Sequence, residues 1–248
     1  MGSARVLITA MNLLLLEPSD VIASDRALLK AGDPRFQHIV SILDSQPGDY
    51  LRAGLLNGPM GSAQIDSRAP DQITLSLTLD QLPPAKLPLT IILALPRPKM
   101  IRRVLRTVAE MGVSELILIN TYKVEKSYWR SPALNDEAVQ GYFKEGVQQA
   151  RDTVLPNLRM ARLFKPFVED ELPQIVAGKK ALVAHPGHYP PCPIAFNQPC
   201  VLAIGPEGGF IDYEILKLQA ADFECVQMGE RILRVETALT SLVARLYC

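Results

Sequence analysis

The sequence lacks the signatures that identify several large enzyme classes. No Gly-x-Gly-x-x-Gly run follows a predicted strand, so a Rossmann site for a nicotinamide or flavin cofactor is not expected. The chain also contains no Gly-x-x-x-x-Gly-Lys-Ser/Thr loop for nucleotide hydrolysis and no Gly-x-Ser-x-Gly nucleophile elbow. Any chemistry must therefore be carried by other loops.

The sequence also lacks a net charge that would drive it onto a nucleic acid. It carries 26 Lys and Arg against 26 Asp and Glu over 248 residues. A protein held on RNA by bulk charge would be basic, so any RNA contact must come from a local patch. Residues 1–83 carry six basic and nine acidic side chains, whereas residues 84–248 carry 20 and 17, which favours the second part as the surface for an anionic partner.

Cysteines and long hydrophobic runs are scarce. The cysteines form no Cys-x-x-Cys pair and lie late in the chain, at Cys192, Cys200, Cys225 and Cys248. They indicate buried free thiols in a reducing compartment rather than a disulfide framework. The apolar run Leu13–Leu16 is too short to span a membrane, and no clear signal region precedes it. We therefore expect a cytoplasmic protein with no membrane contact.

Histidines are rare, and no metal site is expected. His185 and His188 have a spacing that suits a shared metal, but no cysteine or carboxylate lies close in sequence to complete the ligand set. His38 is more simply explained as a packed structural histidine.

Prolines divide the chain into two parts. Residues 82–88 read Leu-Pro-Pro-Ala-Lys-Leu-Pro and predict a linker. Before it, turn signals at 46–49 and 57–58 and the alternating run Ile73–Leu79 predict a small β-rich, barrel-like domain over residues 1–82. Within that domain, Val21–Leu29 is predicted to be a short helix and Phe36–Leu43 a second short apolar segment.

After the linker, predicted strands alternate with predicted helices over residues 88–248. The expected helices are 98–111, 135–150, 212–220 and 235–247, and the expected strands are 89–95, 115–119, 159–163, 181–184, 201–204 and 224–227. This order is typical of an α/β domain with a mostly parallel sheet that helices cover on both faces.

One loop of the second part leaves a strand, is rich in glycine and enters a helix. Residues 204–210 hold three glycines and a single carboxylate, Glu207. Open α/β sheets bind ligands at the carboxyl ends of their strands, where glycines let the backbone approach a ligand closely. An ordinary strand-to-helix turn is the alternative. Asp212 is the candidate N-cap of the helix that follows.

A second loop, residues 228–234, also joins a strand to a helix. Its apolar members can wall a flat ring while Arg231, Arg234 and the nearby Glu236 face a reacting group. The alternative is a helix N-terminal turn with surface arginines.

A basic cluster begins near residue 97 and is not interrupted by an acid as far as residue 106. It comprises Arg97, Lys99, Arg102, Arg103 and Arg106, and it is followed by Lys123, Lys126 and Arg130 among the aromatic residues Tyr122, Tyr128 and Trp129. Cations can hold phosphates and rings can stack on unpaired bases, so this cluster favours an RNA contact. A solvated helix face is the alternative.

The two loops together closely resemble one family. Gly-Pro-Glu-Gly-Gly-Phe at 205–210, followed by Met-Gly-Glu-Arg-Ile-Leu-Arg-Val-Glu-Thr-Ala at 228–238, resembles the 16S ribosomal RNA uridine-N3 methyltransferases of the SPOUT class. Weaker likeness covers 38–49, 109–113 and 148–156. The resemblance implies a PUA-like N-terminal barrel, a C-terminal α/β domain with a deep trefoil knot, a homodimer, S-adenosylmethionine (SAM) as cofactor and small-subunit ribosomal RNA, in the assembled subunit, as substrate.

The resemblance also implies site residues. Cofactor contacts are expected at Ala184, His185, Ile204, Gly205, Pro206, Glu207, Gly209, Met228, Gly229, Ile232, Leu233 and Arg234. Apart from the resemblance, the basic cluster predicts RNA contacts at Arg97, Lys99, Arg102, Arg103, Lys123, Lys126 and Arg130, and Arg151 is a further expected RNA contact.

Methyl transfer to uridine N3 requires alignment of donor and acceptor, a cation for charge that grows on the uracil carbonyls, and a base for the N3 proton. Arg234 is the first candidate for the cation and Arg231 the second. Glu236 or Glu207 is the candidate base, although Glu207 can equally brace its own loop.

The residues expected to face RNA depart from the family pattern. The stretch that begins at His38 usually ends in arginine but here reaches Asp44, and the usual Glu-Gln-x-x-Arg appears changed and out of register at Gln148–Asp152. Two alternatives therefore stay open. One is a SPOUT enzyme for transfer RNA or large-subunit RNA, and the other is a non-catalytic RNA-binding or ribosome assembly factor that holds SAM.

Overall fold

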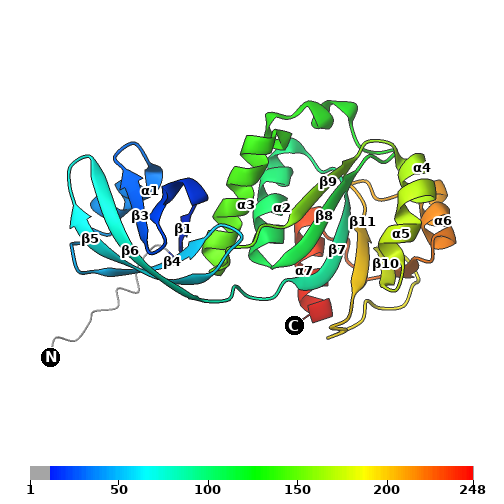
Figure 1. Cartoon of the computed structure of the whole chain (residues 1–248). Coiled ribbons are helices and arrows are strands. Elements are labelled where there is room, and N and C mark those ends of the chain that lie inside the picture. Colours follow the sequence, from blue (N-terminus) through cyan, green and yellow to red (C-terminus); the bar gives the residue numbers. More distant parts are fainter. Residues whose placement is uncertain (1–11, 248) are drawn as a thin grey trace. The chain divides into compact units, whose positions relative to one another are not determined.

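The computed structural model describes residues 12–247, which form two compact units (Figure 1). One unit contains the chain up to Ala85 together with Lys144–Leu155, and the other contains Lys86–Phe143 and the chain from Pro156 onward. The chain passes between the units three times, and the first passage, from Ala85 to Lys86, lies inside the expected linker. Residues 1–11, with which the predicted first domain begins, and Cys248 lie outside the described residues.

The segment 144–155 packs with the first unit, although the sequence analysis placed it in the second domain. Thr153 accounts for this difference, because its carbonyl accepts a hydrogen bond from Asn57 N at 2.8 Å and its hydroxyl donates to Gly58 O at 2.6 Å. The sequence pattern of the helix gave no sign of these contacts, which join residues far apart in the chain.

The first unit is built on a six-stranded sheet in the order β1-β4-β5-β6-β3-β2. Its elements are β1 (Leu14–Leu16), β2 (Val21–Ala23), β3 (Arg26–Lys30), α1 (Pro34–Ser41), β4 (Tyr50–Leu55), β5 (Met60–Arg68) and β6 (Gln72–Gln81). β1 pairs with β4 in parallel, and the other neighbouring pairs are antiparallel. Among the described strands, β1 and β2 are the two edges of this sheet, so the barrel stays a prediction.

The helix predicted at Val21–Leu29 is wrong, because this segment forms β2 and β3. Ala27 and Leu29 are buried and lie opposite Leu75 and Ile73 of β6. Pairing with β6 satisfies the backbone hydrogen bonds of the segment and buries alternate side chains, which outweighs the weak helical spacing.

Other predictions for the first unit are confirmed. The turn at 57–58 joins the antiparallel strands β4 and β5, and Asn57 has a φ of 57°, a left-handed conformation that Asn tolerates better than most residues. The run 73–79 lies inside β6. The apolar segment after Asp33 is helix α1, whose first N–H groups are capped by the Asp33 carboxylate, which accepts from Arg35 N at 2.7 Å.

The second unit contains the six-stranded sheet β12-β10-β11-β7-β8-β9, in which all neighbouring pairs are parallel, as predicted (Figure 1). The strands are β7 (Leu87–Ala94), β8 (Val113–Ile119), β9 (Asn157–Ala161), β10 (Lys180–Ala184), β11 (Cys200–Ile204) and β12 (Glu224–Val226). The helices are α2 (Pro98–Glu110), α4 (Phe164–Pro166), α5 (Leu172–Val176), α6 (Asp212–Ala220) and α7 (Val235–Tyr247), and α3 (Asp136–Ala150) runs from this unit into the first.

Each helix and strand predicted after residue 88 is present within a few residues of its expected limits. The sequence analysis missed the helical turns over Phe164–Val176, between β9 and β10. Two prolines and two short apolar clusters in this segment hide the helical period. No helix among residues 12–247 combines the length and apolarity needed to cross a membrane.

The last helix is held by the segment that precedes β11. Ala195 N and Asn197 N donate to the carbonyls of Arg245 and Leu246, at 2.8 and 3.1 Å. The Arg245 guanidinium donates in turn to Cys192 O at 2.6 Å. The end of α7 is therefore fastened through its otherwise free carbonyls, which every helix C-terminus must satisfy.

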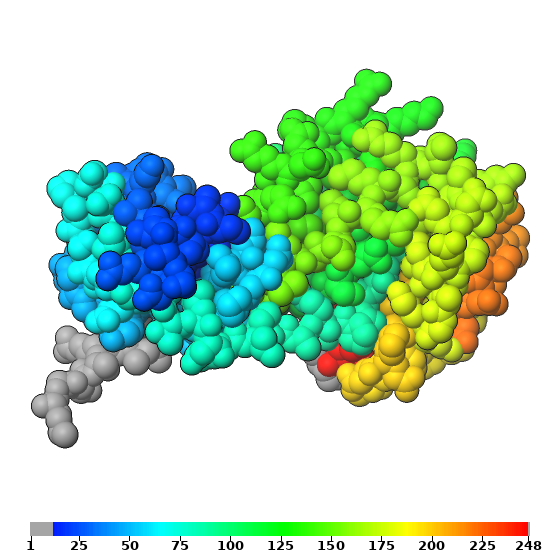
Figure 2. Space-filling view, viewed as in Figure 1, coloured from blue at the N-terminus to red at the C-terminus, as the bar shows by residue number. Residues whose placement is uncertain are grey.

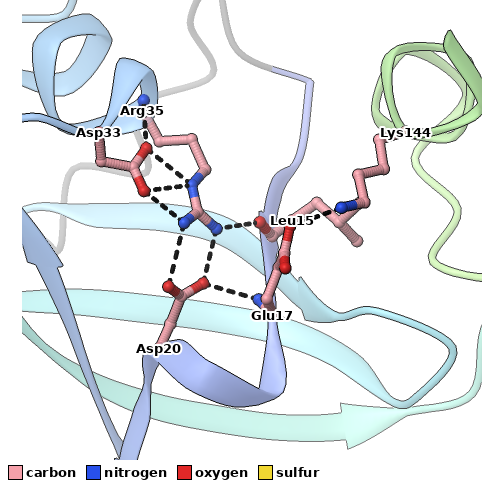
Figure 3. Close-up of polar contacts among 6 residues, drawn as sticks. All are labelled: Leu15, Glu17, Asp20, Asp33, Arg35 and Lys144. Atoms are coloured by element: carbon pink, nitrogen blue, oxygen red, sulfur yellow. Dashed lines mark hydrogen bonds and ion pairs between the residues drawn. The ribbon is translucent and has the colours of Figure 1, made fainter. Parts of the chain in front are cut away.

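Arg35 holds together one edge of the first unit (Figure 3). Its guanidinium donates to both oxygens of Asp20, at 2.6 and 3.0 Å, to Asp33 Oδ1 at 2.9 Å and to Leu15 O at 2.8 Å. These side chains are at most 20% exposed. Burial alone would raise the pKa of Asp33, but the hydrogen bonds and charge of Arg35 outweigh it and keep the pKa below its ordinary value.

Replacing Arg35 with Met should destabilise the first unit by about 2 kcal/mol at neutral pH, because two largely buried carboxylates lose their cation. Since the folded-state pKa of Asp33 is lowered, this stabilisation exists above the ordinary Asp pKa and is lost as the pH falls through the folded value. Hydrogen exchange over residues 14–41 in urea should show the difference at pH 7 and a smaller one below about pH 3.

Arg68→Met is the matched control within the same unit. Its carboxylate partner, Asp44, is 78% exposed, so the loss should be markedly smaller. Equal losses in the two variants would contradict the role given to Arg35.

Candidate active site

The carboxyl ends of three strands meet at one edge of the parallel sheet. Ala184 of β10 lies opposite Ile204 of β11 on one side and Val226 of β12 on the other. The loops that leave these strands, together with α7, enclose a cavity of about 470 Å³. This volume is typical of a small-molecule site, and the place is where an open α/β sheet binds its ligand.

The predicted cofactor residues, apart from Arg234, line this cavity. They are Ala184, His185, Ile204, Gly205, Pro206, Glu207, Gly209, Met228, Gly229, Ile232 and Leu233. Of the predicted catalytic residues, Arg231 lines the cavity, whereas Arg234 and Glu236 do not. The catalytic roles of the two arginines stay predictions, and only Arg231 is placed at the cavity wall.

Sequence reasoning missed part of the wall. The residues it did not predict are Pro186, Gly187, His188, Tyr189, Phe210, Val226, Gln227, Glu230, Val235, Ala238 and Leu242. A signal existed for residues 186–189, because they directly follow the predicted strand 181–184 and so belong to the same sheet edge. The α7 residues carried no such signal, since only packing turns them toward the cavity.

Two glycines in the wall are required by the backbone rather than by space. Gly209 and Gly229 have φ angles of +71° and +102°, and a Cβ at either position would meet no atom within 4 Å. Residues with side chains rarely adopt such angles, so glycine is needed for the loops to take this course.

Glu207 joins the cavity loop to the start of α2. Its Oε1 accepts a hydrogen bond from Arg97 N at 3.3 Å and lies 3.9 Å from Arg97 Nε. Lys123 reaches the same loop and donates from Nζ to Gly208 O at 2.6 Å. Two residues predicted to contact RNA, Arg97 and Lys123, are therefore brought beside the cavity.

The other predicted RNA residues of the second unit lie in exposed positions. Lys99, Arg102 and Arg103 are on α2, and Lys126 and Arg130 are in the 3-10 turn Lys126–Arg130. In Figure 2, the segment between β8 and α3, coloured green, carries side chains that project from the surface. Arg151 belongs to the first unit, so it is not placed with this group.

Trp129 does not offer the stacking surface that the sequence suggested. The residue is 9% exposed, its Nε1 donates to Asn120 Oδ1 at 2.8 Å, and the Arg162 guanidinium lies 5.2 Å from the ring centroid. An amphipathic side chain whose polar atom is paired inside the protein is a core residue.

The predicted N-cap of α6 is also corrected. Asp212 is the first residue of the helix, and Ile211 occupies the cap position. Glu214 replaces the missing cap side chain, because its Oε2 accepts from Ile211 N at 3.0 Å.

His185 presents a buried polar atom in the cavity wall. Its Nδ1 has no hydrogen-bond partner among the described residues, and its ring meets the Tyr189 ring edge-on with centroids 6.0 Å apart. Burial lowers the pKa of His185; the Asp212 carboxylate opposes this shift, and the Lys123 ammonium adds to it. Within residues 12–247, no group of three or more His, Cys, Asp or Glu side chains is placed to hold a metal ion.

A family model described as the RNA methyltransferase domain matches residues 83–247. The chain belongs to the RNA methyltransferase domain family. It is 32% identical over 244 residues to ribosomal RNA small subunit methyltransferase E of Treponema pallidum. This alignment covers 94% of this chain and 90% of that protein. The protein of the same name from Synechocystis is 27% identical over 247 residues, covering 94% and 76% of the two chains.

A solved structure shares the fold. Ribosomal RNA small subunit methyltransferase E from Neisseria gonorrhoeae, bound to S-adenosyl methionine, is 18% identical and aligns with a TM-score of 0.72 over 95% of this chain and 96% of that one.

His185 should titrate below the ordinary histidine pKa of about 6.5. NMR of the imidazole Cε1–H between about pH 5 and 8 should show this low midpoint, with His185→Asn to assign the signal. Because the unfolded chain holds the proton more tightly than the folded one, stability should fall as the pH drops below the ordinary value. A midpoint at or above the ordinary value would contradict the burial of Nδ1.

Proposed function

We propose that this family member is a SAM-dependent methyltransferase that modifies N3 of a uridine in the 16S RNA of the small ribosomal subunit. The observation that carries the proposal is the cavity at the carboxyl edge of the sheet, whose wall includes the loops after β10, β11 and β12. Membership of the RNA methyltransferase domain family and the names of the relatives support the reaction and the substrate class.

The chemistry of the wall fits this cofactor. The side chains of Met228, Ile232 and Leu233 offer apolar contacts to a flat adenine, while the glycine backbones let it approach closely. The unpartnered His185 Nδ1 offers a polar contact inside the same cavity. When bound, SAM supplies an electrophilic methyl group.

The protein's own residues align the uridine and stabilise its charge. Arg231 lines the cavity and is exposed, so we assign its guanidinium the role of stabilising the negative charge that grows on the uracil carbonyls while solvent water accepts the N3 proton. Glu207 is engaged with Arg97, so we assign it the role of a brace that fixes its loop. The uridine must leave its stack to reach the cavity, which calls for an unpaired or splayed RNA site.

The proposal includes the finer features that the family resemblance implies: a knotted SPOUT domain, a PUA-like first domain, a homodimer and a cytoplasmic location. The hydrogen bonds between the 192–198 segment and the end of α7 support a chain end tucked into its own fold. The buried free thiols Cys192, Cys200 and Cys225 suit a reducing compartment, and burial raises the pKa of Cys200 to about 12.

The decisive test is methyl transfer from isotope-labelled SAM to small ribosomal subunits that lack the modification. Nucleoside mass spectrometry of the digested RNA should show 3-methyluridine. SAM binding without any methylated nucleoside in small-subunit, large-subunit or transfer RNA would favour a non-catalytic assembly factor. A methylated nucleoside in another RNA alone would reject the small-subunit assignment.

The two arginines of the second loop form a matched pair. Arg231→Ala should lower kcat by about 100-fold, because a cation facing the developing charge is removed, while SAM affinity changes only a few-fold. Arg234→Ala, outside the cavity wall, should change kcat only a few-fold. Single-turnover methyl transfer and calorimetry with SAM measure the two effects, and a larger loss for Arg234→Ala would reverse the assignment.

A further inference from the structure

Tyr122 is a large aromatic residue that the fold leaves in solvent. The residue is 79% exposed, and its hydroxyl has no hydrogen-bond partner among the described residues. The chain on both sides is anchored, because Thr121 and Val124 are buried and Val124 N donates to Thr121 O at 3.1 Å. A short turn with fixed ends therefore presents one ring to solvent.

A buried carboxylate fixes the backbone of this turn. Glu214 of α6 is 2% exposed, and its Oε1 accepts from Tyr122 N at 2.7 Å while its Oε2 accepts from Ile211 N. Burying a carboxylate is unfavourable unless hydrogen bonds satisfy it, so these contacts restrict the turn to one position. An aromatic ring held in place in advance loses little conformational entropy when it binds a partner.

The turn lies beside the cavity loop. The residue after Tyr122, Lys123, donates to Gly208 O at 2.6 Å, and both neighbours of Gly208 line the cavity. Arg97, whose side chain is 68% exposed, lies against Glu207 of the same loop. The exposed Tyr122 ring and the cations of Lys123 and Arg97 therefore belong to segments that contact the same cavity loop, residues 204–210.

We propose that Tyr122 is the platform on which a base of the RNA substrate stacks when the neighbouring uridine enters the cavity; this inference rests on the proposed function. Proteins read unpaired RNA by stacking bases on exposed rings, with cations holding the phosphates. The other aromatic residues of this segment are engaged elsewhere: Trp129 is buried, and the Tyr128 hydroxyl donates to Glu125 Oε1 at 3.1 Å.

The test measures RNA binding and methyl transfer separately. Tyr122→Ala should raise the dissociation constant for small-subunit RNA, and the KM for small subunits, by about tenfold, the order expected for loss of one stacked base. The KM for SAM and the thermal unfolding midpoint should stay unchanged. Tyr122→Phe and Tyr122→Trp keep a ring and should bind RNA within about twofold of the wild type.

Tyr213→Ala is the matched control, because this tyrosine lies on the same helix as Glu214, is also exposed, and has the Lys217 ammonium 5.9 Å from its ring centroid. It should bind RNA as the wild type does. Equal RNA affinities of Tyr122→Ala and the wild type would overturn the platform, as would equal losses in the two alanine variants. Because filter binding needs no turnover, a wild type that binds RNA without methylating it would reject the proposed reaction and still decide the role of Tyr122.

Discussion

The register of the parallel sheet is the constraint on which the rest of the second unit depends. Because Ala184, Ile204 and Val226 lie opposite one another, three strands end together and three loops must share one edge. Parallel strands require a crossover between each pair, so the loops that meet here come from segments far apart in the chain. The cavity results from this strand register. Gly209 and Gly229, with their positive φ angles, allow the loops to turn at this edge of the sheet.

Carboxylates then fasten the loops to one another. Glu207 ties the β11 loop to the start of α2, and Glu214 ties the β8 loop to the start of α6. Both accept backbone N–H groups that helix termini and turns leave without partners. These acids therefore hold the wall of the cavity and the Tyr122 turn in fixed relation, which a site built only from flexible loops would not achieve.

The residues that depart from the family pattern have local partners in the first unit. Asp44 pairs with Arg68 at 3.0 Å and has a φ of 45°, while Asp152 is 4% exposed and accepts from Val154 N at 2.9 Å. An arginine at position 44 would lack this ion pair. Asp44 and Asp152 therefore both make contacts inside the first unit.

The sequence by itself determined the alternating strands and helices after residue 88 and the wall contributed by the two motif loops. Apolar runs and glycines specify these features locally, and the rule that ligands bind at the carboxyl ends of strands adds the place. Tertiary structure alone decided that Val21–Leu29 is two strands, that Trp129 is buried, that Arg231 rather than Arg234 lines the cavity, and that α7 closes its wall. Each of these features depends on contacts between residues that are distant in sequence. A local hydrophobic period or motif does not specify which distant residues a strand, an aromatic ring or a helix will pack against.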